Sequence, residues 1–192
     1  MTASHSAHRC FGTGDPLMEA YHDLEWGLPV HDSRALFEKL VLDSFQAGLS
    51  WRTILHKREA FRRAFHGFDP ERIARYSARD RTRLLADAGI VRNRLKIDAA
   101  IGNARAYLRL EDEQGSFAEY LWGFTGGRSL RPRAARAWRQ VPTHSPESDA
   151  MSKDLQAHGF RFVGPTICYA FMQAVGMVDD HLVGCFRYQQ RR

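Results

Sequence analysis

The chain has 192 residues, of which 44% are hydrophobic and 26% are charged, and these are the proportions of an ordinary globular protein that buries one core. No apolar run approaches the ~20 residues of a membrane-spanning helix, and the polar N-terminus lacks the apolar core of a signal peptide, so we expect a cytoplasmic protein. The net charge of +6 favours a polyanionic partner, usually nucleic acid, although many basic proteins bind none.

Helix start signals dominate the N-terminal part of the chain. Asp15 followed by Pro16 has the pattern of an N-cap with proline at the first helical position. A second helix is predicted from Asp32, because its apolar residues recur with the 3.6-residue period of a helix. A third begins near Ser50 and is expected to close on Gly67, since glycine is favoured just after a helix. The periodic apolar residues of the second helix are Leu36, Phe37, Leu40, Val41 and Phe45.

Helical signals continue through the rest of the sequence. Asp69 repeats the Asp-Pro start, and Ser77 with Asp80 forms a weaker relative of a capping box. The stretch 91–110 is the longest predicted helix, and two more helical segments follow residue 147. No stretch alternates with the period of two that a half-buried strand requires. The sequence therefore predicts an all-α fold.

Residues 125–147 are rich in glycine, arginine and proline, and we expect a long basic loop there. Its five arginines either contact phosphates or form a solvated surface, and the second alternative is the more common one. We expect one domain over residues 10–188, with 125–147 as the boundary should it divide into two helical lobes. Residues 1–9 are predicted to be a disordered tail, and residues 189–192 a second tail.

Three cysteines, an odd number, argue against a disulfide framework and for a metal site or free thiols. His181 and Cys185 are spaced by one helical turn, which places both on one face if the segment is helical. With Cys10 and His22 from the opposite end they form a Cys₂His₂ set, which suits tetrahedral Zn²⁺. The alternative is that each is an isolated side chain. Cys168 lies in an apolar run and is expected in the core.

The segment from Gly159 to Gly164 has the form of a hairpin between two helices, with Pro165 near the start of the second. Such a helix-hairpin-helix turn directs backbone N–H groups at a DNA phosphate without reading the base sequence. Gly159, Phe162 and Gly164 are the candidate DNA contacts. An ordinary turn between helices is the alternative.

Carboxylates and aromatic side chains gather in two short segments near residues 21–26 and 43–51. Such a set could form a binding pocket, because stacking, cation–π contact and charge pairing together recognise a flat cation. Alternatively, the aromatic residues are core and Asp43 is a satisfied helix residue. The candidates are Tyr21, Asp23, Glu25, Trp26, Asp43, Phe45 and Trp51.

From Arg9 to Cys185 the sequence resembles the bacterial 3-methyladenine DNA glycosylase I family, and "QAGLSW" and "DHLVGC" are its most specific segments. The resemblance implies a fold of the helix-hairpin-helix glycosylase superfamily and a structural zinc. The zinc ligands of the family correspond to Cys10, His22, His181 and Cys185, so the ion would join the C-terminal segment to the first helix. Four protein ligands leave no open position, so we expect no metal-activated water. Further matching segments are "DPLMEAYHDLEWGLPVHD", "DAGIVRNRLKIDAAIGNARAYL" and "GFRFVGPTICYAFMQAVGMVDDHLVGC".

The resemblance also implies a monofunctional enzyme that excises 3-methyladenine from double-stranded DNA by base flipping. Trp51 would stack on the flipped base, Tyr21 would bond to its edge and Asp43 would meet its positive charge. Water is the nucleophile, and no cofactor besides Zn²⁺ is expected. Asp179 and Asp180 follow the hairpin, where related glycosylases carry a catalytic aspartate. The resemblance implies that this family does not depend on one, and a catalytic role for either residue stays open. We expect a monomer without an obligate protein partner.

Four positions depart from the family pattern. Asp43 replaces the usual glutamate, Ser44 a common glycine, Gly12 an expected tryptophan and Met18 a frequent tyrosine. We expect Phe11 to cover the pocket in place of that tryptophan. Because the pocket is altered, two other functions remain open: a DNA-binding paralogue with little catalysis, and a glycosylase for another alkylated base.

Overall fold

The computed structural model describes residues 8–190, and its regular structure there is helical throughout, so the all-α prediction is confirmed. Residues 1–7 of the predicted N-terminal tail and residues 191–192 lie outside the described part. No helix in that part is long and apolar enough to cross a membrane. The α-helices are α1 (Pro16–Leu24), α2 (Ser33–Gln46), α3 (Trp51–Ala64), α4 (Pro70–Ala74), α5 (Ala78–Ala86), α6 (Arg94–Gln114), α7 (Phe117–Gly123), α8 (Pro146–Ala157), α9 (Pro165–Ala174) and α10 (Phe186–Gln189), and the 3₁₀ turns are η1 (His66–Phe68) and η2 (Trp138–Gln140).

The predicted helix starts are confirmed, because each is set by a local hydrogen bond. The Asp15 carboxylate accepts from the backbone N–H groups of α1, Asp32 does the same for α2, and Ser50 for α3. The end of α3 differs from the prediction: the helix stops at Ala64, and Gly67 lies inside η1 with φ 63°. There the chain turns so that buried aromatic rings stack, Phe65 on Phe68, with centroids 5.7 Å apart.

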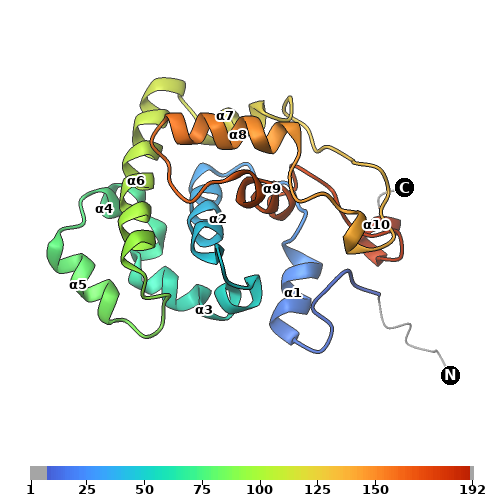
Figure 1. Ribbon diagram of the computed structural model, residues 1–192, viewed down its shortest axis with the longest axis horizontal. Helices are drawn as coiled ribbons and strands as arrows, with labels where there is room; N and C mark the ends of the chain where they lie inside the picture. Colours follow the sequence, from blue (N-terminus) through green and yellow to red (C-terminus); the bar gives the residue numbers. More distant parts are fainter. Residues whose placement is uncertain (1–7, 191–192) are drawn as a thin grey trace.

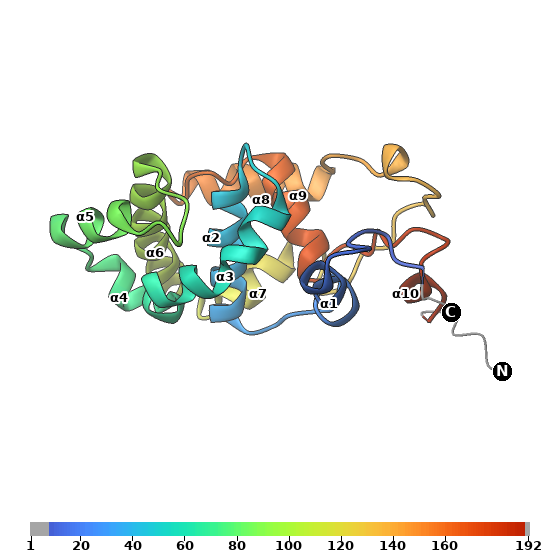
Figure 2. The same ribbon diagram turned by 90° about the horizontal axis from the view of Figure 1, so that it is seen from below.

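Helix α2 is the centre of the molecule, with α3, α6, α7 and α9 packed around it (Figure 1). Because helices pack around it, α2 buries two polar residues, Asp43 and Ser44, in addition to its apolar residues. Helices α4 to α6 form one end of the elongated molecule (Figure 2). Helices α1 and α10 form the other end, so segments near the two chain termini lie together there.

The basic segment 125–147 contains no α-helix, in agreement with the predicted loop. It is nevertheless tied to the C-terminal segment, because Leu130 and Val178 form a parallel β-bridge. Leu130 N donates to Met177 O over 2.8 Å, and Asp179 N donates to Leu130 O over 2.9 Å. These bonds direct the loop across the molecule, and its turn η2 reaches the end that contains α1 (Figure 1).

Candidate functional site: a cysteine–histidine cluster beside an aromatic cavity

Cys10, His22, His181 and Cys185 meet at the α1 end of the molecule, and their ligand atoms all lie within 4.8 Å of one another. Cys185 Sγ is 3.4 Å from His22 Nε2 and 3.6 Å from His181 Nδ1. Cys10 Sγ is 3.5 Å from His181 Nδ1. Three of the four residues are buried, and Cys10 is half-buried. The structure thus brings together the four residues selected from the sequence, in an arrangement consistent with a metal site.

A carboxylate and a guanidinium orient His22 within this cluster. His22 Nδ1 is 2.8 Å from Asp23 Oδ1, so its Nε2 atom faces the cysteines. Arg9 donates to both oxygens of Asp23, over 2.9 Å from Nε to Oδ1 and 2.7 Å from Nη2 to Oδ2. These bonds from Arg9, followed by that from His22, lower the pKa of Asp23, so the carboxylate stays ionised. Such an outer carboxylate fixes the ring orientation of a metal-binding histidine.

The pKa of the Cys10 thiol is raised within the cluster, so a cation beside it would favour its ionisation. Burial, and then the neighbouring Cys185, raise the pKa of Cys10 to about 12, although the N–H of Leu182 donates to its Sγ over 3.3 Å and opposes this shift. A bound divalent ion supplies the missing positive charge and converts cysteines to thiolate ligands. The donor set therefore fits a metal. Cys168, by contrast, lies in the core, where its Sγ donates to Val163 O over 3.2 Å.

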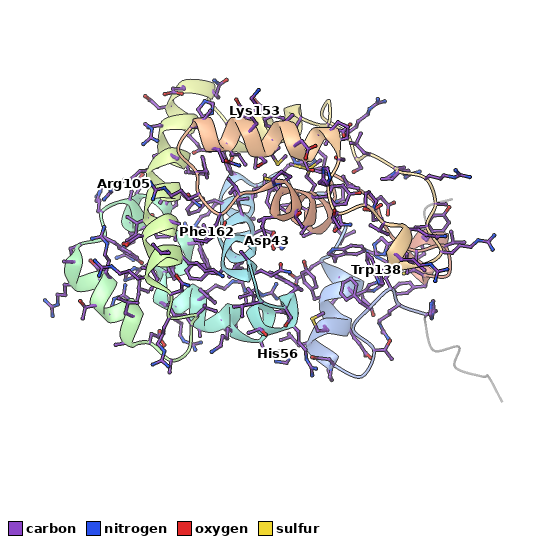
Figure 3. The ribbon with its side chains drawn as sticks, in the orientation of Figure 1. Asp43, His56, Arg105, Trp138, Lys153 and Phe162 are labelled. Atoms are coloured by element: carbon purple, nitrogen blue, oxygen red, sulfur yellow. The ribbon has the colours of Figure 1, made fainter. Side chains whose placement is uncertain are left out.

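Beside the cluster lies a cavity of about 190 Å³, to which α1, α2, α3 and α9 contribute walls. The predicted pocket residues Tyr21, Asp43, Trp51 and Phe11 all line it. The rings of Tyr21 and Trp51 lie 5.2 Å apart at 42° and form one wall. Asp43 lies near the middle of the molecule (Figure 3). The remaining lining residues are Met18, Trp26, Lys39, Gln46, Trp138, Ala170, Gln173 and Ala174.

Asp43 is 1% exposed, and its two carboxylate oxygens have different surroundings. Oδ1 forms an ion pair with the Lys39 ammonium, which also lies 3.8 Å from the centroid of the Trp51 ring. Within residues 8–190, Asp43 Oδ2 and Trp51 Nε1 are both buried without a hydrogen-bond partner. Burial raises the pKa of Tyr21 well above its usual value, so its hydroxyl remains a proton donor. The cavity thus holds an acceptor and a donor for a flat polar ligand.

Sequence reasoning missed Trp138 and Lys39. Trp138 comes from η2, on the right side of Figure 3, and its Nε1 donates to Cys10 O over 3.0 Å. Its ring lies 6.3 Å from that of Phe11 and 6.1 Å from that of Trp26. A tryptophan within an arginine-rich loop was the only available signal for Trp138. Lys39 had none, because it follows Glu38 on α2 and looks like an ordinary surface residue.

The departures from the family pattern are accommodated locally. A Cβ atom at Gly12, which has φ 93°, would lie 2.9 Å from the Met18 backbone carbon, so the close approach to α1 requires glycine here. Ser44 satisfies its hydroxyl by donating to Leu40 O over 2.8 Å within α2. Phe11 lines the cavity together with Trp138, and Met18 fills part of another wall.

The other candidate carboxylates have separate partners. Asp180 is buried and accepts from the Tyr169 hydroxyl over 2.7 Å and from Gln173 Nε2 over 2.8 Å, which holds a cavity-lining amide in place. Glu25 accepts from Arg58 Nη2 over 2.9 Å outside this cavity. Together with the role of Asp23 at the cluster, this leaves Asp43 as the carboxylate of the cavity.

The predicted hairpin joins α8 to α9, and the two helices pack against each other. Gly159 has φ 90° and Phe162 has φ 57°, both in the left-handed region, while Gly164 is the N-cap of α9. Asn103 of α6 anchors the turn, since its Nδ2 donates to Arg161 O over 3.1 Å and its Oδ1 accepts from Arg161 N over 2.8 Å. Phe162, labelled in Figure 3, lies on this turn.

Comparison with known proteins identifies the family and agrees with the fold. A family described as methyladenine glycosylase matches residues 11–188. The chain is 51% identical over 176 residues to DNA-3-methyladenine glycosylase 1 of Escherichia coli K12, covering 91% of this chain and 92% of that protein. It is 47% identical to DNA-3-methyladenine glycosylase of Haemophilus influenzae over 165 residues, covering 86% and 89%. A crystal structure of 3-methyladenine DNA glycosylase I superposes with a TM-score of 0.90 at 52% identity, covering 93% and 98%.

The fold is thus that of a helical DNA glycosylase. The chain belongs to the methyladenine glycosylase family, as its sequence motifs indicated.

Proposed function

We propose that this chain, a DNA-3-methyladenine glycosylase, starts base excision repair by removing 3-methyladenine from alkylated DNA, and that the aromatic cavity receives the flipped base. The observation that carries the proposal is the buried Asp43 Oδ2, which has no hydrogen-bond partner in the described chain, on a residue that lines a cavity together with Tyr21 and Trp51. A buried acceptor without a partner is costly, and a ligand that donates to it while carrying positive charge removes that cost.

The substrate supplies much of the driving force for the reaction. Alkylation at N3 gives the adenine ring a positive charge, so the base leaves readily when the bond between C1′ and N9 breaks and its electron pair moves to the base. Water adds to C1′ and loses a proton. Trp51 stacks on the extruded base, Tyr21 donates to its edge and Asp43 pairs with its charge. Extrusion costs a few kcal/mol and is cheapest for a damaged base, which adds to selectivity.

We propose Zn²⁺ as the ion of the cysteine–histidine cluster. A tetrahedral site with Zn–S near ~2.3 Å and Zn–N near ~2.05 Å sets sulfur and nitrogen about 3.6 Å apart. The sulfur–nitrogen distances of 3.4, 3.5 and 3.6 Å support this assignment. Because four protein ligands complete the shell, the ion contributes folding energy and holds the C-terminal segment on α1, while the chemistry takes place at the neighbouring cavity.

We further propose that the turn containing Gly159, Phe162 and Gly164 contacts a phosphate of double-stranded DNA. The left-handed conformation at Gly159 and Phe162 and the N-terminus of α9 support it, since such turns present backbone N–H groups to anions. The positively charged chain favours the same partner. Because the substrate is DNA, we place the protein in the cytoplasm, acting as a monomer through residues 10–188 without an obligate partner.

Base release from DNA treated with a methylating agent tests the proposed function. We expect the parent protein to release free 3-methyladenine from the DNA. Trp51→Ala should release much less, although its unfolding temperature should change little. Release of a different alkylated base would indicate the alternative glycosylase. Binding to methylated DNA without release of any base would indicate a catalytically inactive paralogue, and either result would contradict the proposal.

A further inference from the structure

The ammonium group of Lys39 occupies a position that a cationic base also requires. Lys39 and Asp43 are one turn apart on α2, and the Lys39 side chain is only 14% exposed. Its Nζ atom pairs with Asp43 Oδ1 and lies 3.8 Å from the centroid of the Trp51 ring. Charge pairing with Asp43 and cation–π contact with Trp51 are two of the three interactions expected for the flipped base. Lys39 therefore already forms the charge pair with Asp43 and the cation–π contact with Trp51 that the base would form.

A second cavity offers a place to which this ammonium can move. It has a volume of about 320 Å³ and shares Tyr21, Lys39 and Trp51 with the first cavity, so these side chains separate the two spaces. Glu25 and Glu38 line the second cavity, each held by an arginine. Burial is the largest influence on the pKa of Lys39 and lowers it; Asp43 raises it, Arg58 lowers it and Glu25 raises it by less. A Lys39 side chain that rotates away from Asp43 thus meets two carboxylates that are each already paired with an arginine.

The other well-buried lysine of the described chain has a different environment. Lys96 donates to the carbonyl oxygens at the C-terminal end of α2, including Phe45 O over 2.8 Å, where a cation stabilises the helix end. Within residues 8–190, the Lys39 ammonium donates to no backbone carbonyl, and its partners are two side chains that line the first cavity, Asp43 and Trp51. Its burial is therefore tied to the cavity and not to the capping of a helix.

We propose that Lys39 is a specificity-determining residue that competes intramolecularly with the alkylated base for Asp43 and the Trp51 ring, and that base binding displaces it toward the second cavity. This inference rests on the proposed base pocket. If a neutral base displaced the Lys39 ammonium, the buried Asp43 carboxylate would lose its counter-charge, which is strongly unfavourable. A cationic base restores the charge balance when it enters. After bond cleavage Lys39 returns to Asp43, and the competition hastens release of the product base.

Because 3-methyladenine is neutral once its bond to C1′ has broken, the probe is 3,9-dimethyladeninium, in which a second methyl group at N9 keeps the positive charge of the base in DNA. Its binding is measured by calorimetry and by quenching of tryptophan fluorescence. Lys39→Met removes the competing charge with a side chain of similar length, and we expect it to bind the base roughly ten-fold more tightly than the parent. Lys39→Arg retains the charge and should bind no more tightly than the parent. Lys153→Met removes the same charge from the exposed face of α8, far from Asp43 (Figure 3), and should leave base affinity unchanged.

A double-mutant cycle separates competition from a general effect on the fold. In an Asp43→Asn background, Lys39→Met should give little further gain, because the competition acts through the carboxylate. If Lys39→Met unfolds, Lys39→Gln replaces it in the same comparison. The pocket itself is tested first: the base should quench the fluorescence of the parent, and Trp51→Phe should abolish this quenching. If that holds and the uncharged variants of Lys39 bind the base equally or more weakly than the parent, the inference is wrong and the pocket stands. If the parent shows no such quenching and Asp43→Asn excises normally, both the pocket and the inference are wrong.

Discussion

The indole N–H of Trp138 donates to the carbonyl oxygen of Cys10 over 3.0 Å, and this bond joins the basic loop to the first ligand of the cysteine–histidine cluster. The next residue along the chain, Phe11, lines the base cavity beside Trp138. The cluster and the cavity therefore share one short segment. An ion bound by Cys10 would therefore also help to fix the wall formed by Phe11.

Trp138→Ala should lower affinity for 3-methyladenine by about ten-fold, because it removes an aromatic wall and the bond that holds it. Trp138→Phe should fall between this variant and the parent, since it keeps a ring but loses the donor. Trp138 is 41% exposed, so we expect the unfolding temperature to change little. The neighbouring Arg139→Ala serves as the control in calorimetric titrations. Parent-like affinity of Trp138→Ala would remove Trp138 from the pocket.

Loss of metal should destabilise the protein more than it alters the cavity chemistry. We expect about one zinc per chain by elemental analysis, and Cys185→Ala should lower the unfolding temperature strongly because the site contributes folding energy. Protein purified without chelator that contains no zinc would disprove the assignment.

Asp23→Asn tests the support of His22 separately from the ligands themselves. It should weaken zinc binding by roughly 10–100-fold, because the ring loses its charged orienting partner. Asp98→Asn is the matched control, since Asp98 pairs with Arg81 over 2.7 Å at the surface, away from the cluster. Competition with a chromogenic chelator measures both variants, and equal zinc affinity would show that Asp23 does not support the site.

The features that the sequence could predict are those set by local bonds or by a distinctive set of residue types. Asp15 and Asp32 start helices through hydrogen bonds within their own turn, and two cysteines with two histidines are rare enough to suggest a shared ion. The end of α3 was mispredicted because the helix stops at Ala64, where the chain turns and buries the stacked rings of Phe65 and Phe68, and glycine preference alone does not indicate such packing. Lys39 and Trp138 were missed because their contacts come from packing between distant segments, which leaves no pattern in either neighbourhood.

Gly164→Asp should weaken DNA binding by about ten-fold while the fold is retained. Position 164 has φ −64° and no atom within 4 Å of an added Cβ, and aspartate is a favoured N-cap, so α9 should tolerate it. The new negative charge would repel a phosphate at the turn. Gly164→Ala adds the Cβ without the charge and is the control. Loss of affinity that is equal for all DNA sequences, measured by fluorescence anisotropy, is the expected result; unchanged affinity would indicate an ordinary turn.

Substitutions of Asp43 test the carboxylate of the pocket directly. Asp43→Asn should slow excision of 3-methyladenine, because the amide cannot balance the charge of the base. It should also destabilise the fold, since Lys39 loses its buried counter-ion. Asp43→Glu keeps the charge and restores the side chain usual in the family, so we expect equal or faster excision. Single-turnover rates corrected for the folded fraction, compared with thermal unfolding of both variants, separate catalysis from stability. If Asp43→Asn excises the base at the parent rate per folded molecule, Asp43 has only a structural role and does not recognise the base.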